Sequence, residues 1–67
     1  MNIYLNNTPQ EIQASSTITN VLGSLNIPAQ KGVAIAVNNN VIPRAEWEAH
    51  ILMAEDKVTL IKATQGG

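Results

Sequence analysis

Short segments in which every second residue is apolar lie in both halves of the chain, and this alternation predicts β-strands. The first such segment is residues 2–6, and the next is residues 8–14. Asn6-Asn7 between them suits the tight turn of a hairpin, because asparagine tolerates the left-handed backbone conformation. Pro9 fits an edge strand, where a missing amide donor is tolerated. The chain is therefore expected to begin with a β-hairpin.

The following segment has the spacing of an amphipathic helix. Four apolar residues fall on one stripe, at positions i, i+3, i+4 and i+7: Ile18, Val21, Leu22 and Leu25. Thr17 or Ser16 is expected to cap the start of the helix, and Pro28 lies just beyond its end. Gly23 in the interior costs up to about 1 kcal/mol relative to alanine. These residues predict one helix over positions 17–26.

Three further strands are predicted in the second half of the chain. Residues 33–37 are apolar on both faces, which indicates a central strand covered by the helix on one side. Asn38-Asn39-Asn40 is expected to form a turn, and residues 41–43 a short strand that Pro43 ends. Residues 44–50 are expected to form a helical turn in which Trp47 anchors the core. Residues 57–63 alternate again and predict the last strand.

The resulting element order, β-β-α-β-β-β, predicts an α+β fold of the β-grasp, or ubiquitin-like, type. In this arrangement a mixed sheet of four to five strands grips one main helix. The helix is expected to join the first hairpin to a parallel central strand by a right-handed crossover. The last strand is also expected to be central. The predicted organisation is a domain over residues 1–62 and a flexible tail over residues 63–67 that ends in Gly66-Gly67.

Composition narrows the possible functions. The chain has 67 residues, a net charge of −1, no cysteine and a single histidine, His50. The lack of cysteine excludes disulfides, thiolate nucleophiles and most zinc sites, and a reducing cytoplasm is the expected location. The scattered basic residues give no electrostatic footprint for nucleic acid. The longest apolar run, Val33–Val37, is too short for a membrane span of about 20 residues. With no glycine-rich phosphate loop and no catalytic pair, the chain is expected to be neither an enzyme nor a cofactor-binding or metal-binding protein.

Two stretches carry a family resemblance. Residues 36–47, AVNNNVIPRAEW, combine a strand, an Asn-led turn, a second strand and a Pro-Arg-x-x-Trp sequence, and the chain ends in Gly66-Gly67. On these residues the sequence closely resembles the ThiS family, the sulfur carrier proteins of thiamine biosynthesis, over almost its whole length. Two features depart from the family pattern. Glu55 replaces the glycine of a Gly-Asp turn that is common in the family. The turn at residues 38–40 is rich in asparagine, where many relatives have Asn-Gly. Both departures are expected to affect only local loop geometry.

The resemblance implies that the protein is a cosubstrate and that its partners are the catalysts. A ThiF-like adenylyltransferase would consume ATP to convert the carboxylate of Gly67 to an acyl adenylate. A sulfur-donating enzyme would then leave a thiocarboxylate, whose sulfur a ThiG-like thiazole synthase would receive. Thr64, Gln65, Gly66 and Gly67 would enter the partners' active sites. A terminal carboxyl has a pKa of about 3.5, so it is ionised at neutral pH and can attack an activated phosphate.

The folded body is expected to dock the partners, because a five-residue tail offers little area for a specific interface. The predicted docking surface is the sheet face opposite the helix, with Ile61 and one or more alanines of residues 33–37 as candidate contacts. Three alternatives stay open. They are the small subunit of molybdopterin synthase, a ubiquitin-like modifier that joins Gly67 to a lysine, and a binding module with an incidental Gly-Gly end.

Overall fold

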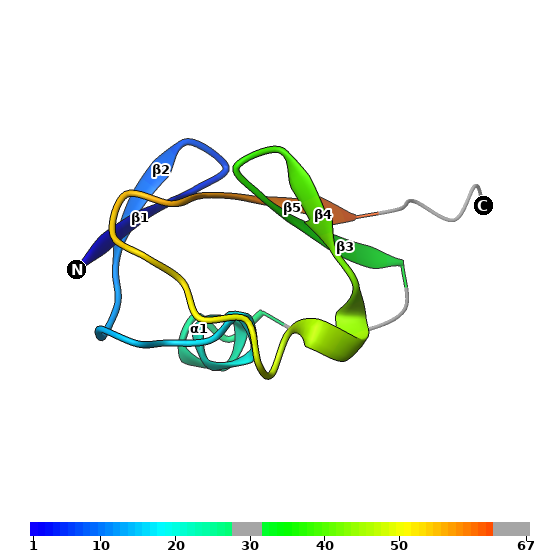
Figure 1. The fold of residues 1–67 in the computed structure, drawn as a ribbon. Coiled ribbons are helices and arrows are strands. Elements are labelled where there is room, and N and C mark those ends of the chain that lie inside the picture. Colours follow the sequence, from blue (N-terminus) through cyan, green and yellow to red (C-terminus); the bar gives the residue numbers. More distant parts are fainter. Residues whose placement is uncertain (28–31, 63–67) are drawn as a thin grey trace.

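The computed structural model describes residues 1–27 and 32–62, which form a five-stranded sheet with one α-helix packed against one face (Figure 1). In chain order the elements are β1 (Asn2–Leu5), β2 (Thr8–Glu11), α1 (Ile18–Ser24), β3 (Val33–Val37), β4 (Asn40–Ile42), the short 3₁₀ helix η1 (Arg44–Glu46) and β5 (Lys57–Lys62). This order confirms the α+β arrangement expected from the sequence. The tail predicted over residues 63–67 lies outside the described residues.

The strands lie side by side in the order β2-β1-β5-β3-β4, so β5 is the middle strand, as predicted. β1 pairs with β5 in parallel, and all other pairs are antiparallel. The sequence predicted that the strand at residues 33–37 runs parallel to its partner in the first hairpin, and this was wrong. β3 is an interior strand but lies next to edge strand β4, and the parallel partner of the first hairpin is β5. The reason is that β5 inserts between β1 and β3, which keeps the two hairpins apart.

Both hairpin turns are made by pairs of asparagines in the left-handed backbone region. Asn6 and Asn7 have φ angles of 49° and 68°, and Asn38 and Asn39 have φ angles of 51° and 72°. Two successive left-handed residues match the right-handed twist of the flanking strands. Both predicted turns are confirmed, except that Asn40 is already the first residue of β4.

The helix starts with a reciprocal cap. The Thr17 hydroxyl oxygen accepts a hydrogen bond from the Asn20 amide at 3.1 Å, and the Asn20 side-chain oxygen accepts one from the Thr17 amide at 3.0 Å. This satisfies two amides that have no partner within the helix. Thr17 is therefore the cap, whereas the Ser16 hydroxyl donates to the carbonyl of Gln13. The helix is shorter than predicted, because Asn26 adopts a left-handed φ of 57°.

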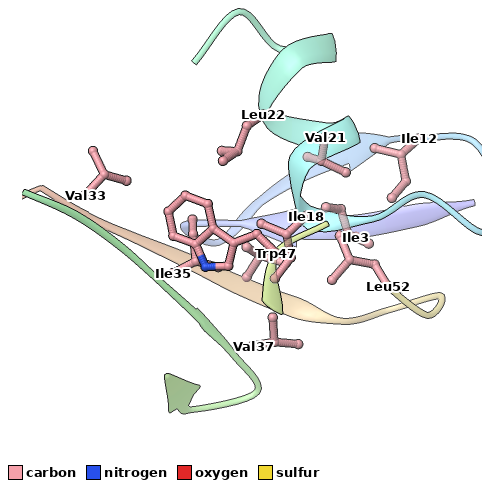
Figure 2. Packing of buried hydrophobic residues seen from close by; sticks show 11 residues of the cluster. Ile3, Ile12, Ile18, Val21, Leu22, Val33, Ile35, Val37, Trp47 and Leu52 are labelled. Atoms are coloured by element: carbon pink, nitrogen blue, oxygen red, sulfur yellow. The ribbon is translucent and has the colours of Figure 1, made fainter. Parts of the chain in front are cut away.

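The core lies between the helix and one face of the sheet (Figure 2). Its buried cluster comprises Ile3, Ile12, Ile18, Val21, Leu22, Val33, Ile35, Val37, Trp47, Leu52 and Val58. Three of the four residues of the predicted helical stripe belong to this cluster, and Leu25 packs against it half-buried. No helix in the described ranges is both long enough and apolar enough to cross a membrane.

Candidate functional site

β5 ends at Lys62, five residues before the predicted carrier group, the carboxylate of Gly67. On the helix side of this strand Val58 is buried and Leu60 is half-buried against the core. β5 pairs with β3 over its last five residues, from Val37 opposite Val58 to Val33 opposite Lys62. The strand is therefore held in the sheet as far as Lys62. The residues predicted to enter partner active sites, Thr64 to Gly67, lie outside the described residues.

Both hairpin turns are also attached to β5 through asparagine side chains. The side-chain oxygen of Asn6 accepts a hydrogen bond from the Leu60 amide at 2.9 Å. The side-chain oxygen of Asn38 accepts one from the Lys57 amide at 3.0 Å, and its amide group donates to Asp56 at 3.1 Å. Sequence reasoning assigned these asparagines to turns only. Which main-chain amide donates to each asparagine oxygen depends on the strand order, so no local pattern could have found these bonds.

The face of the sheet away from the helix carries the predicted docking residues. We define the outer sheet face by five residues of β3, β4 and β5: Ala34, Ala36, Val41, Thr59 and Ile61. Cross-strand pairing places Ile61 opposite Ala34, and Ala36 between Thr59 and Val41. Ile61 is 47% exposed and Val41 is 67% exposed, so apolar side chains on this face are accessible.

The structure distinguishes between the alanine candidates. Ala36 is 7% exposed and can offer a partner little area, whereas Ala34 is half-buried. Val41 was missed from the sequence, although its alternation with half-buried Ile42 would have placed it on this face. A docking role for Ile61 stays a prediction, because exposure alone does not define an interface.

The Pro-Arg-x-x-Trp stretch, residues 43–47, connects the end of β4 to the layer that contains the helix. Trp47 lies in the core and is 4% exposed (Figure 2). Its indole Nε1 donates a hydrogen bond of 2.9 Å to the carbonyl of Ile42. The guanidinium carbon of Arg44 lies 4.8 Å from the centroid of the indole ring, which is within cation–π range. Trp47 therefore anchors the core, as predicted. Since β4 runs parallel to β5, this anchor lies at the end of the sheet where β5 finishes.

The described residues present no constellation for catalysis of their own. None of them form a group of three or more His, Cys, Asp or Glu side chains that could hold a metal ion. A groove of about 630 Å³ lies between residues 11–16 and the exposed side of α1. Glu11 is the only ionisable side chain among the residues that line this groove, so the groove lacks a paired acid and base.

Comparison with known proteins gives the family. The model of the ThiS family matches residues 3–67. The chain belongs to the ThiS family. It is 31% identical to the sulfur carrier protein ThiS of Escherichia coli (strain K12), and the match covers 100% of both chains. This sulfur carrier of thiamine biosynthesis is accordingly a carrier protein without catalytic activity, as the resemblance implied.

Two solved structures agree with this assignment. The crystal structure of the thiamine biosynthesis protein ThiS from Geobacter metallireducens has a TM-score of 0.86 at 25% identity and covers 100% of both chains. An NMR solution structure of a thiamine biosynthesis protein from the same organism has a TM-score of 0.77 at 25% identity, and covers 100% of this chain and 88% of that one. The β-grasp fold predicted for this ThiS family member is thereby confirmed.

Proposed function

We propose that the carboxylate of Gly67 is the group that carries sulfur. A ThiF-like adenylyltransferase joins this carboxylate to the AMP portion of ATP and releases pyrophosphate. The mixed anhydride provides the good leaving group that a carboxylate lacks. A sulfur-donating enzyme supplies the sulfur that replaces AMP, which leaves a C-terminal thiocarboxylate. A ThiG-like thiazole synthase then takes up this sulfur. The cysteine-free chain suits a reducing cytoplasm, where these steps would take place.

The family match carries this proposal, because it extends to residue 67 and includes the Gly-Gly end. The sheet supports it as well. β5 pairs with β1 at Lys57 and Val58, and with β3 from Val58 as far as Lys62, so residues 63–67 follow directly from the middle strand. Five extended residues span at most about 16–18 Å. A partner's active site must therefore come within this distance of the end of β5.

The chemistry is tested by incubating the protein with ATP, the ThiF-like enzyme and a sulfur source. We expect one oxygen to be exchanged for one sulfur at Gly67, located by intact mass and mapping of the C-terminal peptide. An isopeptide bond to a lysine, without any thiocarboxylate, would identify a protein modifier instead. Transfer of the sulfur to a pterin precursor, rather than its incorporation into a thiazole ring, would identify a molybdopterin synthase subunit.

Replacing Gly66 with valine tests the role of the Gly-Gly end. A branched side chain next to the reacting carboxylate removes positive φ values and narrows the fit to a channel. Misplacing a reacting group by about 1 Å can cost on the order of a hundredfold in rate. We expect the initial rate of thiocarboxylate formation to collapse while the melting temperature stays unchanged, and deletion of Gly67 to act similarly. Full activity in both variants would mean that the glycines are incidental.

Replacing Ile61 with aspartate tests the outer sheet face as the docking surface. Ile51→Asp is the matched control, since Ile51 is 54% exposed and pairs with Thr17 in the helix layer, away from that face. We expect Ile61→Asp to weaken binding to the adenylyltransferase at least tenfold, measured by calorimetry, and Ile51→Asp to leave it unchanged. Equal affinities for the two variants would refute this choice of face.

A further inference from the structure

β5 loses its main-chain partner on the β1 side before it ends. β1 pairs with β5 only at Tyr4–Lys57 and Leu5–Val58, and the chain then turns back at Asn6. The Asn6 amide still donates to the Val58 carbonyl at 2.9 Å. Among the described residues, no strand lies beside β5 on this side beyond that point. We call the stretch Leu60–Lys62 on the β1 side the open edge.

The hydrogen-bonding groups at the open edge can be assigned from the pairing with β3. The Asn38 amide donates to the Lys57 carbonyl at 2.8 Å, which makes Lys57 a residue whose main-chain groups face β3. These groups alternate along an antiparallel pair. The amides of Thr59 and Ile61 therefore face β3, whereas the main-chain groups of Leu60 and Lys62 face the open edge.

The next hydrogen-bonding position along the open edge has a defined geometry. We call each such position, a carbonyl and the amide two residues later, a rung. In a parallel pair, one residue donates to a carbonyl and accepts from the amide two residues later on the neighbouring strand. Asn6 fills such a rung with its own amide and its side-chain oxygen, between the Val58 carbonyl and the Leu60 amide. The next rung consists of the Leu60 carbonyl and the Lys62 amide, and a single residue of a parallel strand would satisfy both.

The outer edges of the sheet are protected in a way that the open edge is not. Edge strand β2 contains Pro9 and edge strand β4 is followed at once by Pro43, so each lacks a donor that an added strand would need. The open edge contains no proline. It also lies beside Ile61 on the outer sheet face and continues into the carrier residues.

We propose that the open edge pairs with an extended segment of the adenylating partner, which adds to β5 as a parallel strand. This inference rests on the proposed function, since the partner is the enzyme that must hold Gly67 in place. Pairing at the last rung of β5 fixes the direction in which residues 63–67 enter that enzyme. The added segment carries an acidic side chain beside Lys62, because opposite charges on adjacent strands stabilise pairing. A second copy of this chain would meet the open edge as an antiparallel strand, because a twofold axis reverses the direction of the paired strand. Self-association is therefore the outcome that the exchange experiment separates from pairing with the partner.

Amide hydrogen exchange of the ¹⁵N-labelled chain, with and without the ThiF-like adenylyltransferase, tests the pairing directly. We expect exchange at Lys62 to slow at least tenfold in the complex. The neighbouring Ile61 amide is the internal control, because its bond to β3 protects it in both states. Unchanged exchange at Lys62 in a complex that forms normally would overturn the proposal. Slowing at Lys62 that depends on the concentration of the free chain would overturn it in favour of self-association.

Two variants at one position separate the main chain from the side chain. Lys62→Pro removes the amide at the open edge and no bond to β3, while Lys62→Ala keeps the amide and loses the charge. We expect the proline variant to bind the partner threefold to tenfold more weakly than the alanine variant, the range for one hydrogen bond, at an unchanged melting temperature. Equal affinities would refute the edge pairing even if thiocarboxylate forms. Absence of thiocarboxylate from the unmodified chain would refute the proposed function instead.

Discussion

Replacing Glu55 with glycine is expected to stabilise the fold. Glu55 has a φ of 70°, in the left-handed region that glycine adopts freely and other residues rarely do. Its conformation is imposed by the loop, because its amide donates to the carbonyl of Asn2 at 2.7 Å and Asp56 accepts from the Met53 amide at 2.9 Å. A glycine at this position can keep the same backbone and release the steric strain.

The size of the effect follows from three contributions. The left-handed conformation costs a residue with a Cβ atom roughly 1–2 kcal/mol. Glycine also lowers the free energy of unfolding by about 0.5–1 kcal/mol, because it increases the conformational entropy of the unfolded chain. The Tyr4 hydroxyl contact with the Glu55 carboxylate is exposed and 3.5 Å long, so its loss matters little. The net gain lies between about 0 and 1.5 kcal/mol and is centred at about 0.8 kcal/mol, which corresponds to a rise of about 3–6 °C in the melting temperature of a domain of this size.

Thermal unfolding followed by circular dichroism measures this shift. Ala54→Gly is the matched control, because Ala54 is an exposed neighbour in the same turn without a positive φ. The Ala54→Gly substitution increases the conformational entropy of the unfolded chain but relieves no strain in the folded one. We therefore expect the melting temperature of this variant to fall by a few degrees. A melting temperature for Glu55→Gly at or below that of the unmodified protein would refute the strain argument.

Two further substitutions test the packing and the helix. Trp47→Phe should lower the free energy of unfolding by about 1–3 kcal/mol in urea titrations, because it leaves the Ile42 carbonyl without its indole donor; a change below about 0.5 kcal/mol would mean that this bond contributes nothing. Gly23→Ala should raise the same quantity by up to about 1 kcal/mol, since nothing lies within 4 Å of an added Cβ atom. Destabilisation by Gly23→Ala would show that the helix needs its glycine.

Local patterns predicted the elements of this fold because each is specified by its own residues. The spacing of Ile18, Val21 and Leu22 predicted the buried stripe of the helix, and these three side chains are in the core. The paired asparagines predicted both turns. The alternation in β5 placed Ile61 on an exposed face, although its docking role is still untested.

Features that depend on strand order could not be predicted in this way. The pairing of β5 between β1 and β3 is a contact between residues far apart in the chain, and it decides which asparagine oxygen meets which amide. The open edge at Leu60–Lys62 has the same origin, because it exists only where β1 turns back before its neighbour ends. The burial of Ala36 likewise reflects neighbouring strands, since an outward-facing alanine carries no sign of being covered.

The central position of β5 also bears on the order in which the chain folds during synthesis. The β1–β2 and β3–β4 hairpins are local and can form while the chain is still growing. The strand that joins them is the last of the five in sequence, so the sheet closes only after residue 62 has left the ribosome. Contacts between distant residues form slowly compared with local ones. A nascent chain stopped before residue 57 would lack the strand that pairs with both hairpins, and would leave the part of its core that β5 covers exposed to proteases.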